Sequence, residues 1–544
     1  MKGIKPLVFL PPFLLCAAFV VLQFLDQRKP AKEQQFVGLL GDAFNWVAGT
    51  FGWLVSLLSL AMLVLCGVIF VSRFGRTVLG GPDAKKLLTN WQMFAVVLTT
   101  NIAAGILFWG VFEPTWHLSH PPGGIAPNSP EAAHFAISTV YLHWTLTPYA
   151  FGSVVGLMFA FAYFNMRRPF SLGAPLAPLL GRHGSGWVGQ VIDAICLYCL
   201  VAALTAALGG SALLMGGGIN YMFGIKGAPS DSLLAAIILA IMGASVLAAI
   251  SGVTKGIRWI ANANTAFLIG FILLVLFLGP TRFILDFAVE GFGQFLGQYF
   301  QKVLNTGAGQ QAAEAMLAHV KGEPPPEIWA HSWTQMYFSA FFAWAPIMGV
   351  FLGRIAYGYT VRAFLFFNVV LPSIFTGIWM AVICGAVVHM EMIETPHVGL
   401  AAQLDGNNPC AVLFAFLGHL PFGNYLIPVL LITAFLSFVT TADGNTDTMS
   451  NISSKGISPE HTESSMGVKI AWGSLMAAFC WIIVTYFKLD GIRRLSNLGG
   501  FPALFLCLGI GICALMVIAN PARYDKFDKD HVPDPSDESE EPKP

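Results

Sequence analysis

Hydroxyl and carboxylate side chains gather at the end of one apolar run, LITAFLSFVTTADGNTDTMSN, residues 431–451. Ser437, Thr440 and Thr441 place three hydroxyls within about one helical turn, and Asp443 and Asp447 follow. Several oxygen ligands without thiolates or imidazoles suit a hard monovalent cation such as sodium. The alternative is that each hydroxyl bonds back to the carbonyl one turn earlier, as is frequent in membrane helices. The size of the cluster favours the ion.

A second polar group interrupts the apolar segment WQMFAVVLTTNIAAGILFWGVFEP, residues 91–114. Thr99, Thr100 and Asn101 lie near its middle, where polar side chains need partners. The small residues 103–105 follow, so the backbone could open there and present its carbonyls and amides. Close helix packing through small residues explains the same pattern equally well.

Aromatic side chains provide a third signal. The segment LHWTLTPYAF, residues 142–151, contains Trp144 and Tyr149, with Pro148 able to disturb the helix. The segment YFSAFFAWAP, residues 337–346, contains Phe341 and Trp344. Ring faces turned into a water-excluded interior attract organic cations by about 0.5–2 kcal/mol each. For any single ring, packing or an interfacial aromatic belt is the commoner explanation.

Other chemistries find less support. His117, His120 and His143 could suggest a metal site or a proton relay, but we identify no carboxylate or cysteine at ligand spacing and expect no transition metal. We find no phosphate-binding GxxxxGK[ST] loop and no nucleophile with a base and an orienting acid. An ATP-driven pump, an enzyme and a resident cofactor are therefore not expected. A formal net charge of zero gives no indication of a nucleic-acid partner.

Membrane helices must position these residues. The 544-residue chain is 56% hydrophobic and 11% charged, with a mean hydropathy of +0.68, whereas soluble domains contain about 25% charged residues. Since about 20 apolar residues cross a bilayer, we predict an all-α polytopic membrane protein with about twelve transmembrane helices. The predicted spans are residues 6–25, 50–72, 91–113, 135–164, 187–222, 231–250, 259–281, 331–352, 361–390, 421–450, 467–487 and 497–519.

Charged residues in the connections predict the orientation. The predicted outer loops at 114–134 and 391–420 contain no Lys or Arg, and positive residues gather in the other connections. Both termini are therefore expected in the cytoplasm, with the chain in the plasma membrane. The acidic tail is expected to be disordered. Residues 283–304 predict an amphipathic helix at the membrane interface or at a neighbouring subunit, or equally a surface connector.

Taken together, these motifs resemble those of the betaine/carnitine/choline transporter family, of which the chain is identified as a divergent member. The resemblance covers nearly the whole chain. The combination of matching stretches is specific for the family, although no single stretch is. The matching stretches are FWGVFEP at 108–114, HWTLTPYAF at 143–151, PLLGR at 178–182, GVTKGIRWIANAN at 252–264, GPT at 279–281, WTQMYFSAFFAWAP at 333–346, GRIAYGYTVRAF at 353–364 and FVTTAD at 438–443.

The resemblance implies two peripheral helices followed by a five-plus-five inverted repeat that works by alternating access. It also implies a homotrimer, with the interfacial helix at the subunit contacts. The corresponding segments are 1–90 for the tail and peripheral helices, 91–282 for the first repeat, 283–330 for the interfacial helix and loop, 331–519 for the second repeat and 520–544 for the acidic cytoplasmic tail.

Sodium-coupled members of the family hold one ion between the tenth and third spans. The matching positions here are the hydroxyls of Thr440 and Thr441 and the carbonyls of Ser437, Thr99 and Ile102. Asn264 stands where sodium-independent exchangers place an arginine, which favours sodium coupling. Of a second sodium site the chain retains little beyond Thr205.

The substrate positions depart from the family pattern. Members that bind trimethylammonium groups build a box of aromatic rings, and the residues at or beside its positions here are Trp144, Tyr149, Gly152, Ala340, Phe341 and Trp344. The box has therefore fewer rings. Asn101 replaces a glycine of the third span, and its amide adds a donor and an acceptor that suit a carboxylate, a sulfonate or an amine.

These residues predict a sodium-driven symporter for a small zwitterionic or quaternary ammonium compound related to betaine, choline or carnitine. Asn101, Trp144, Tyr149, Phe341 and Trp344 are the predicted substrate contacts. A sodium-independent exchanger and uptake of an unmethylated zwitterion such as taurine are the alternatives. A passive channel is disfavoured, because the polar residues cluster at mid-span between apolar flanks. The short acidic tail favours nutrient uptake over an osmotic response.

Overall fold

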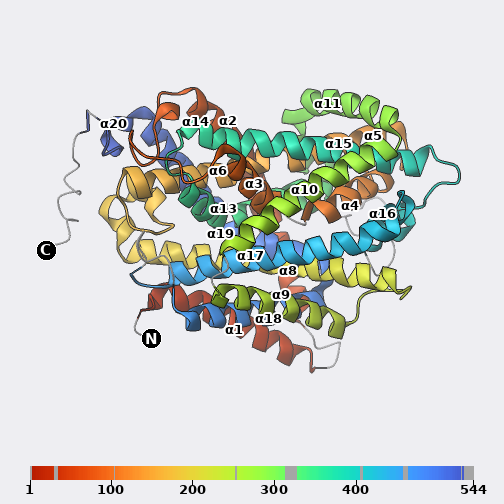
Figure 1. Cartoon of the computed structure of the whole chain (residues 1–544), viewed down its shortest axis with the longest axis horizontal. Coiled ribbons are helices and arrows are strands. Elements are labelled where there is room, and N and C mark those ends of the chain that lie inside the picture. Colours follow the sequence, from red (N-terminus) through yellow and green to blue (C-terminus); the bar gives the residue numbers. More distant parts are fainter. Residues whose placement is uncertain are drawn as a thin grey trace.

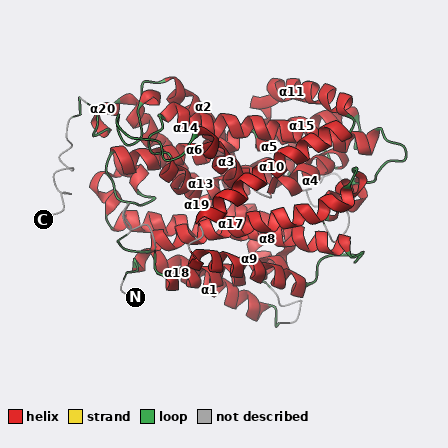
Figure 2. Ribbon diagram, in the orientation of Figure 1, coloured by secondary structure: helices red, strands yellow, loops and turns green. Residues whose placement is uncertain are grey.

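The computed structural model describes residues 3–29, 35–102, 105–251, 254–312, 328–404, 409–456, 464–528 and 530–531. Helices make up most of these ranges, which contain no extended β-strand (Figure 2). Strand-like pairing within them is limited to two isolated bridges, Ile4 with Ser454 and Val78 with Thr360. The all-α prediction is therefore confirmed.

The helices follow one another along the chain with short connections (Figure 1). They are α1 (Pro6–Asp26), α2 (Phe36–Val71), α3 (Asn90–Ile102), α4 (Gly105–Ser119), α5 (Pro130–Trp144), α6 (Thr147–Ala160), α7 (Ala177–Leu180), α8 (Trp187–Met222), α9 (Asp231–Ser251), α10 (Thr254–Leu278), α11 (Thr281–Val303), α13 (Met336–Ile355), α14 (Val361–Leu365), α15 (Leu371–Met392), α16 (Ala411–His419), α17 (Gly423–Ser453), α18 (Met466–Ile482), α19 (Lys488–Ala519) and α20 (Pro521–Tyr524).

Within the described ranges, nine helical segments are long and apolar enough to cross a membrane, or ten if the bent pair of α10 and α11 forms one span. One of the nine, Met466–Ala519, runs through both α18 and α19. The π-helical turn Ile483–Phe487 lies between these two helices, and Lys488, the first residue of α19, has φ +52°. The third predicted span is shared between α3 and α4, with residues 103–104 outside the described ranges. A polytopic membrane protein is confirmed, while the count of about twelve stays a prediction.

The fourth predicted span is broken near its middle. α5 ends at Trp144, Thr145 is extended, and Leu146 has φ +43° before α6 begins at Thr147. Pro148 lies in the first turn of α6, where its missing N–H costs no helical hydrogen bond. The Leu146 amide donates instead to the Ser373 hydroxyl of α15, at 2.7 Å. This break places Trp144 at a helix end that faces the interior.

Small residues let α13 lie close to both α6 and α19, its two most extensive neighbours. A Cβ on Gly353 of α13 would lie 2.6 Å from the Phe159 ring of α6. A Cβ on Gly500 of α19 would overlap the carbonyl oxygen of Ser339 in α13. Close approach through small residues is the usual packing mode between membrane helices. α13 is thereby fixed as the central helix, with α1 on the outside against α8 and α18 (Figure 1).

The amphipathic segment predicted at 283–304 is the helix α11. It bends by 109° from the preceding segment Asn262–Leu278 and packs on α5 and α15. Its other side exposes five large apolar side chains, those of Leu285, Val289, Phe292, Leu296 and Phe300. The predicted segment 283–330 also contains a loop, and residues 313–327 of that loop lie outside the described ranges.

The start of the tail is more ordered than the sequence predicted. Residues 521–524 form α20, and Asp525, which was assigned to a disordered tail, is buried. Its carboxylate accepts a hydrogen bond from Asn165 Nδ2 at 3.0 Å, and the Lys526 amide donates to the Asn165 carbonyl at 3.2 Å. The hydrogen bond from Asn165 therefore compensates for the cost of removing the Asp525 carboxylate from water. Residues 532–544 lie outside the described ranges.

Candidate functional site

A cavity of about 210 Å³ lies inside the bundle, between α4, α5, α6, α8, α13, α17 and α19. Its wall contains four of the five predicted substrate residues and one predicted sodium ligand. These are Trp144, Tyr149, Phe341, Trp344 and Thr441. Residues that lie almost 300 positions apart in the sequence thus share one cavity.

Aromatic rings form much of this wall. α13 contributes Tyr337, Phe341 and Trp344, which are spaced four and three residues apart and so lie along one face of the helix. The Trp144 ring stands edge-on to two of them, with centroids 5.8 Å from Tyr337 and 6.3 Å from Phe341. Because the Trp144 ring is steeply inclined to the rings of Tyr337 and Phe341, these side chains present both ring faces and ring edges to the cavity. An organic cation can contact more than one face there.

Small residues lie beside these rings in the cavity wall. Gly152 and Ala340, at positions where the sequence indicated missing box rings, both line the cavity. Gly105, the first residue of α4, lines it as well. Met348 occupies part of the space beside Gly152, because a Cβ on Gly152 would lie 3.2 Å from Met348 Cβ.

The hydroxyls proposed for sodium converge on one carbonyl. Thr440 Oγ1 donates to the Ser437 carbonyl at 2.7 Å, and Thr441 Oγ1 donates to the same oxygen at 2.9 Å. This is the back-bonding alternative considered above, and it also gathers three oxygen atoms at one place on α17. The bonded hydroxyls keep lone pairs that could face a cation. Both interpretations of the motif therefore remain compatible with the geometry.

The other half of the predicted ion site lies at the end of α3. Thr99, Asn101 and Ile102 belong to its last turn, and their side chains lie outside the described part of the structure. Their roles stay predictions. Asn264 of α10, which stands in place of an arginine, is buried.

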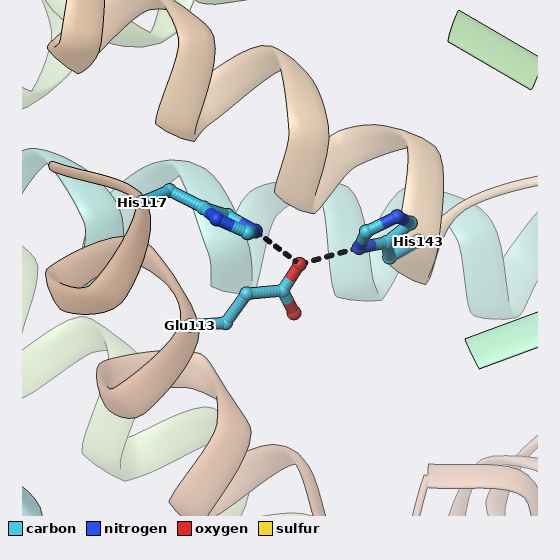
Figure 3. A group of neighbouring side chains, drawn as sticks. All are labelled: Glu113, His117 and His143. Carbon is cyan, nitrogen blue, oxygen red and sulfur yellow. Dashed lines mark hydrogen bonds and ion pairs between the residues drawn. The ribbon is translucent and has the colours of Figure 1, made fainter. Parts of the chain in front are cut away.

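A buried carboxylate, that of Glu113, lies between the rings of His117 and His143 (Figure 3). Glu113 of α4 is fully buried, and its Oε1 is hydrogen-bonded to Nδ1 of His143 at 2.5 Å. Its Oε2 accepts from the indole Nε1 of Trp144 at 2.8 Å. The second ring nitrogen of His143 lies 3.0 Å from the Thr334 hydroxyl. One carboxylate thus fixes the orientation of a ring that lines the cavity.

His117 completes a cluster of three buried side chains. Its Nε2 lies 3.4 Å from Glu113 Oε1, because the two residues are one helical turn apart on α4. Two imidazoles and a carboxylate can bind zinc, and these ligand atoms lie within 4.8 Å of one another. A metal would, however, displace the hydrogen bond between His143 and Glu113 Oε1, and Glu113 Oε2 is already used by Trp144. We therefore interpret the cluster as a support for Trp144.

Sequence reasoning missed two residues here. It found no carboxylate near the histidines, although Glu113 precedes His117 by four residues and so lies on the same helix face. It also placed Arg493 in a connection between spans, whereas α19 begins at Lys488 and Arg493 lines the cavity. The helix-face spacing could have identified Glu113. Only the helix boundary reveals Arg493.

The comparison with known families agrees with this architecture. Residues 7–523 match the family model described as BCCT, betaine/carnitine/choline family transporter. The chain belongs to the BCCT family. It is 28% identical, over 87% of its length and 91% of the relative's, to a probable glycine betaine transporter of Desulfitobacterium hafniense. It is also 28% identical to the glycine betaine transporter OpuD of Bacillus subtilis, over 88% of this chain and 87% of that protein.

Another BCCT relative is named for a different compound. The high-affinity choline transport protein of Escherichia coli K12 is 26% identical over 86% of this chain and 66% of its own length. The BCCT chain described here is therefore a multi-pass membrane transporter and not an enzyme, as the sequence predicted. The relatives differ in named substrate, so the substrate must be argued from the cavity.

Proposed function

We propose that this protein is a plasma-membrane symporter that imports a small quaternary ammonium or zwitterionic compound together with sodium. One observation carries the proposal. The cavity lined by Trp144, Phe341 and Trp344 is also lined by Thr441, whose hydroxyl converges with that of Thr440 on a single carbonyl oxygen. The relatives named for betaine and choline support a substrate with a quaternary nitrogen.

A shared wall gives a physical route to coupling. A sodium ion held at Thr440 and Thr441 would order the segment of α17 that borders the cavity, so substrate and ion would each strengthen the binding of the other. Breaks in helices at mid-membrane are typical of transporters that alternate between two open states. The break between Trp144 and Thr147 lies at the cavity wall and is a candidate hinge.

The decisive experiment measures the sodium dependence of substrate binding in Thr441→Ala. Thr433→Ala is the matched control, because Thr433 lies on the same helix and its hydroxyl also bonds one turn back, at 2.8 Å from the Val429 carbonyl. Loss of one oxygen ligand should weaken the sodium response of Thr441→Ala by tenfold or more, with Thr433→Ala unchanged. An unaltered sodium response in Thr441→Ala contradicts the ion assignment.

Uptake of an unmethylated zwitterion such as taurine is a second candidate. The small side chains of Gly152 and Ala340 favour it, since fewer ring faces surround a methylated nitrogen. Competition between glycine betaine and taurine for the purified protein separates the two. Counterflow in sodium-free medium would instead indicate an exchanger.

We also propose that the protein is a homotrimer with both termini in the cytoplasm. The outward apolar face of α11 supports the subunit contact, because five large apolar side chains are exposed on one side of this helix. Mass measurement of the protein in detergent, compared with a Phe292→Glu, Phe300→Glu variant, tests the assembly. A monomeric wild-type protein contradicts it.

A further inference from the structure

Charge is placed unevenly around the cavity. Arg493, in the second turn of α19, is the one charged side chain among the described residues that line it. The other described lining residues are apolar or aromatic, or carry only hydroxyl or thiol groups. In surroundings of low dielectric constant, a fixed charge acts strongly on any ligand that enters.

Contacts hold the Arg493 guanidinium at one end of a row of rings. Its Nη2 donates to the Ser332 carbonyl at 2.6 Å, and its Cζ lies 4.9 Å from the centre of the Trp333 ring. The Trp333 ring lies 6.3 Å from Tyr337, and the Tyr337 ring lies 5.8 Å from Trp144. Two rings, Trp333 and Tyr337, therefore connect Arg493 to Trp144.

The Trp144 ring of this row carries a carboxylate partner. The buried carboxylate of Glu113 lies at the N–H edge of the Trp144 ring and accepts the indole hydrogen bond at 2.8 Å. The face of this ring stays open to a cation, and a guanidinium favours a carboxylate or sulfonate. The cavity wall thus contains both a ring that suits a cation and a guanidinium that suits an anion.

We propose that Arg493 receives the anionic group of a zwitterionic substrate, and so selects zwitterions over purely cationic quaternary amines. This inference rests on the proposed function, because it takes the aromatic end of the cavity to hold a quaternary nitrogen. A ligand that carries only a positive charge meets Arg493 without a compensating group. A ligand with a carboxylate gains a charge-assisted hydrogen bond at the same position.

A purely structural role is the competing explanation. The hydrogen bond to Ser332 ties α19 to the π-helical turn His331–Gln335 that precedes α13. If that were the whole role, removing Arg493 would weaken all ligands by a similar factor. The proposal instead requires a change in the ratio of two affinities.

The test compares glycine betaine with choline in binding to the purified full-length protein. Both ligands carry the same trimethylammonium group, and choline has a hydroxyl where glycine betaine has a carboxylate. We expect the wild-type protein to bind glycine betaine about tenfold or more tightly than choline. Arg493→Gln should weaken glycine betaine about tenfold and leave choline unchanged or tighter, and Arg493→Lys should retain part of the preference.

The neighbouring Arg494 provides a matched control, because it is absent from the cavity wall and approaches Gly41 of α2. Arg494→Gln should keep the wild-type ratio. If Arg493→Gln does not fold, the methyl ester of glycine betaine replaces the variant, since esterification removes the negative charge and adds one methyl group. The wild-type protein should bind the ester about tenfold more weakly than glycine betaine.

Any of the following results would overturn the inference. The wild-type protein could bind choline or the ester as tightly as glycine betaine, or Arg493→Gln could weaken both ligands equally. Failure of both ligands to bind the wild-type protein would overturn the inference and also contradict a trimethylammonium substrate, which leaves the unmethylated zwitterion as the candidate. Sodium-dependent binding of choline with no preference for glycine betaine would remove the role of Arg493 while leaving the transport proposal in place.

Discussion

Replacing Glu113 by glutamine should destabilise the protein and loosen the Trp144 ring in the cavity wall. Glutamine keeps the shape of the side chain but has one carbonyl oxygen in place of two carboxylate oxygens. The native carboxylate uses both oxygens, one on His143 and one on Trp144. The variant can therefore satisfy one of these donors, and it turns an N–H group toward the other.

The magnitude follows from the burial of the site. Glu113, His117 and His143 are each fully buried. A lost charge-assisted hydrogen bond is worth about 1.5–3 kcal/mol, and removing one partner of a buried ion pair costs about 3–5 kcal/mol. Since glutamine retains one hydrogen bond, we expect a loss of about 3 kcal/mol in the free energy of unfolding. Substrate binding should weaken about tenfold if Trp144 loses its fixed orientation.

The assay is thermal unfolding of the purified protein in detergent, combined with substrate binding. Glu394→Gln is a close control, because Glu394 also pairs with two histidines, His389 at 3.3 Å and His419 at 2.8 Å, but is partly exposed. Exposed ion pairs contribute about 0–1 kcal/mol. The melting temperature of Glu394→Gln should stay near that of the wild type, with that of Glu113→Gln clearly lower.

Equal melting temperatures for the two variants would refute this reasoning, since burial would then add nothing to the hydrogen bonds of Glu113. A destabilised Glu113→Gln variant that binds substrate normally would refute the second part. In that case the cluster would stabilise the bundle without fixing the position of Trp144.

Two further substitutions test the packing and the titration of single residues. Gly500→Ala should cost about 1–3 kcal/mol, because its Cβ would overlap the Ser339 carbonyl, while Gly270→Ala, with nothing within 4 Å, should be neutral or stabilising in the same unfolding assay. Burial lowers the pKa of Lys302 on α11 to about 7 from its ordinary 10.5. Between these two pKa values, Lys302 is protonated in the unfolded chain and neutral in the folded protein. The free energy of unfolding of the wild type should therefore rise with pH from about 7 to 10, by at most about 1.4 kcal/mol per pH unit. Lys302→Met should flatten this rise, and substitution of the exposed Lys226 should not; a slope unchanged in Lys302→Met rejects the assignment.

The fold could be predicted to a large extent because its helices are encoded locally. Apolar runs of about 20 residues and the amphipathic segment at 283–304 identified most membrane helices and α11. The sequence suggested only a disturbance at Pro148, not two separate helices. The break depends on the Leu146 backbone and on a hydrogen bond to Ser373, which is 227 residues away.

Several site residues could also be predicted, because the residue types indicate their chemistry. Rings indicate cation binding, and adjacent hydroxyls indicate a hard cation, so Trp144, Phe341 and Thr441 were found before the structure placed them on one cavity. Glu113 was not predicted as a site residue, because a carboxylate near the end of a membrane span needs no functional role to explain it. Its contact with His143 joins residues 30 positions apart on different helices.

Composition and short-range periodicity are enough to predict the membrane class, the helical architecture and the kinds of side chain available for binding. Which of those side chains face one another depends on the packing of the helices. The hydrogen bond from Trp144 to Glu113 and the entry of Arg493 into the cavity depend on the packing of α4, α5, α13 and α19. Such contacts depend on distances between helices, and these are set by close packing of small residues across the whole bundle.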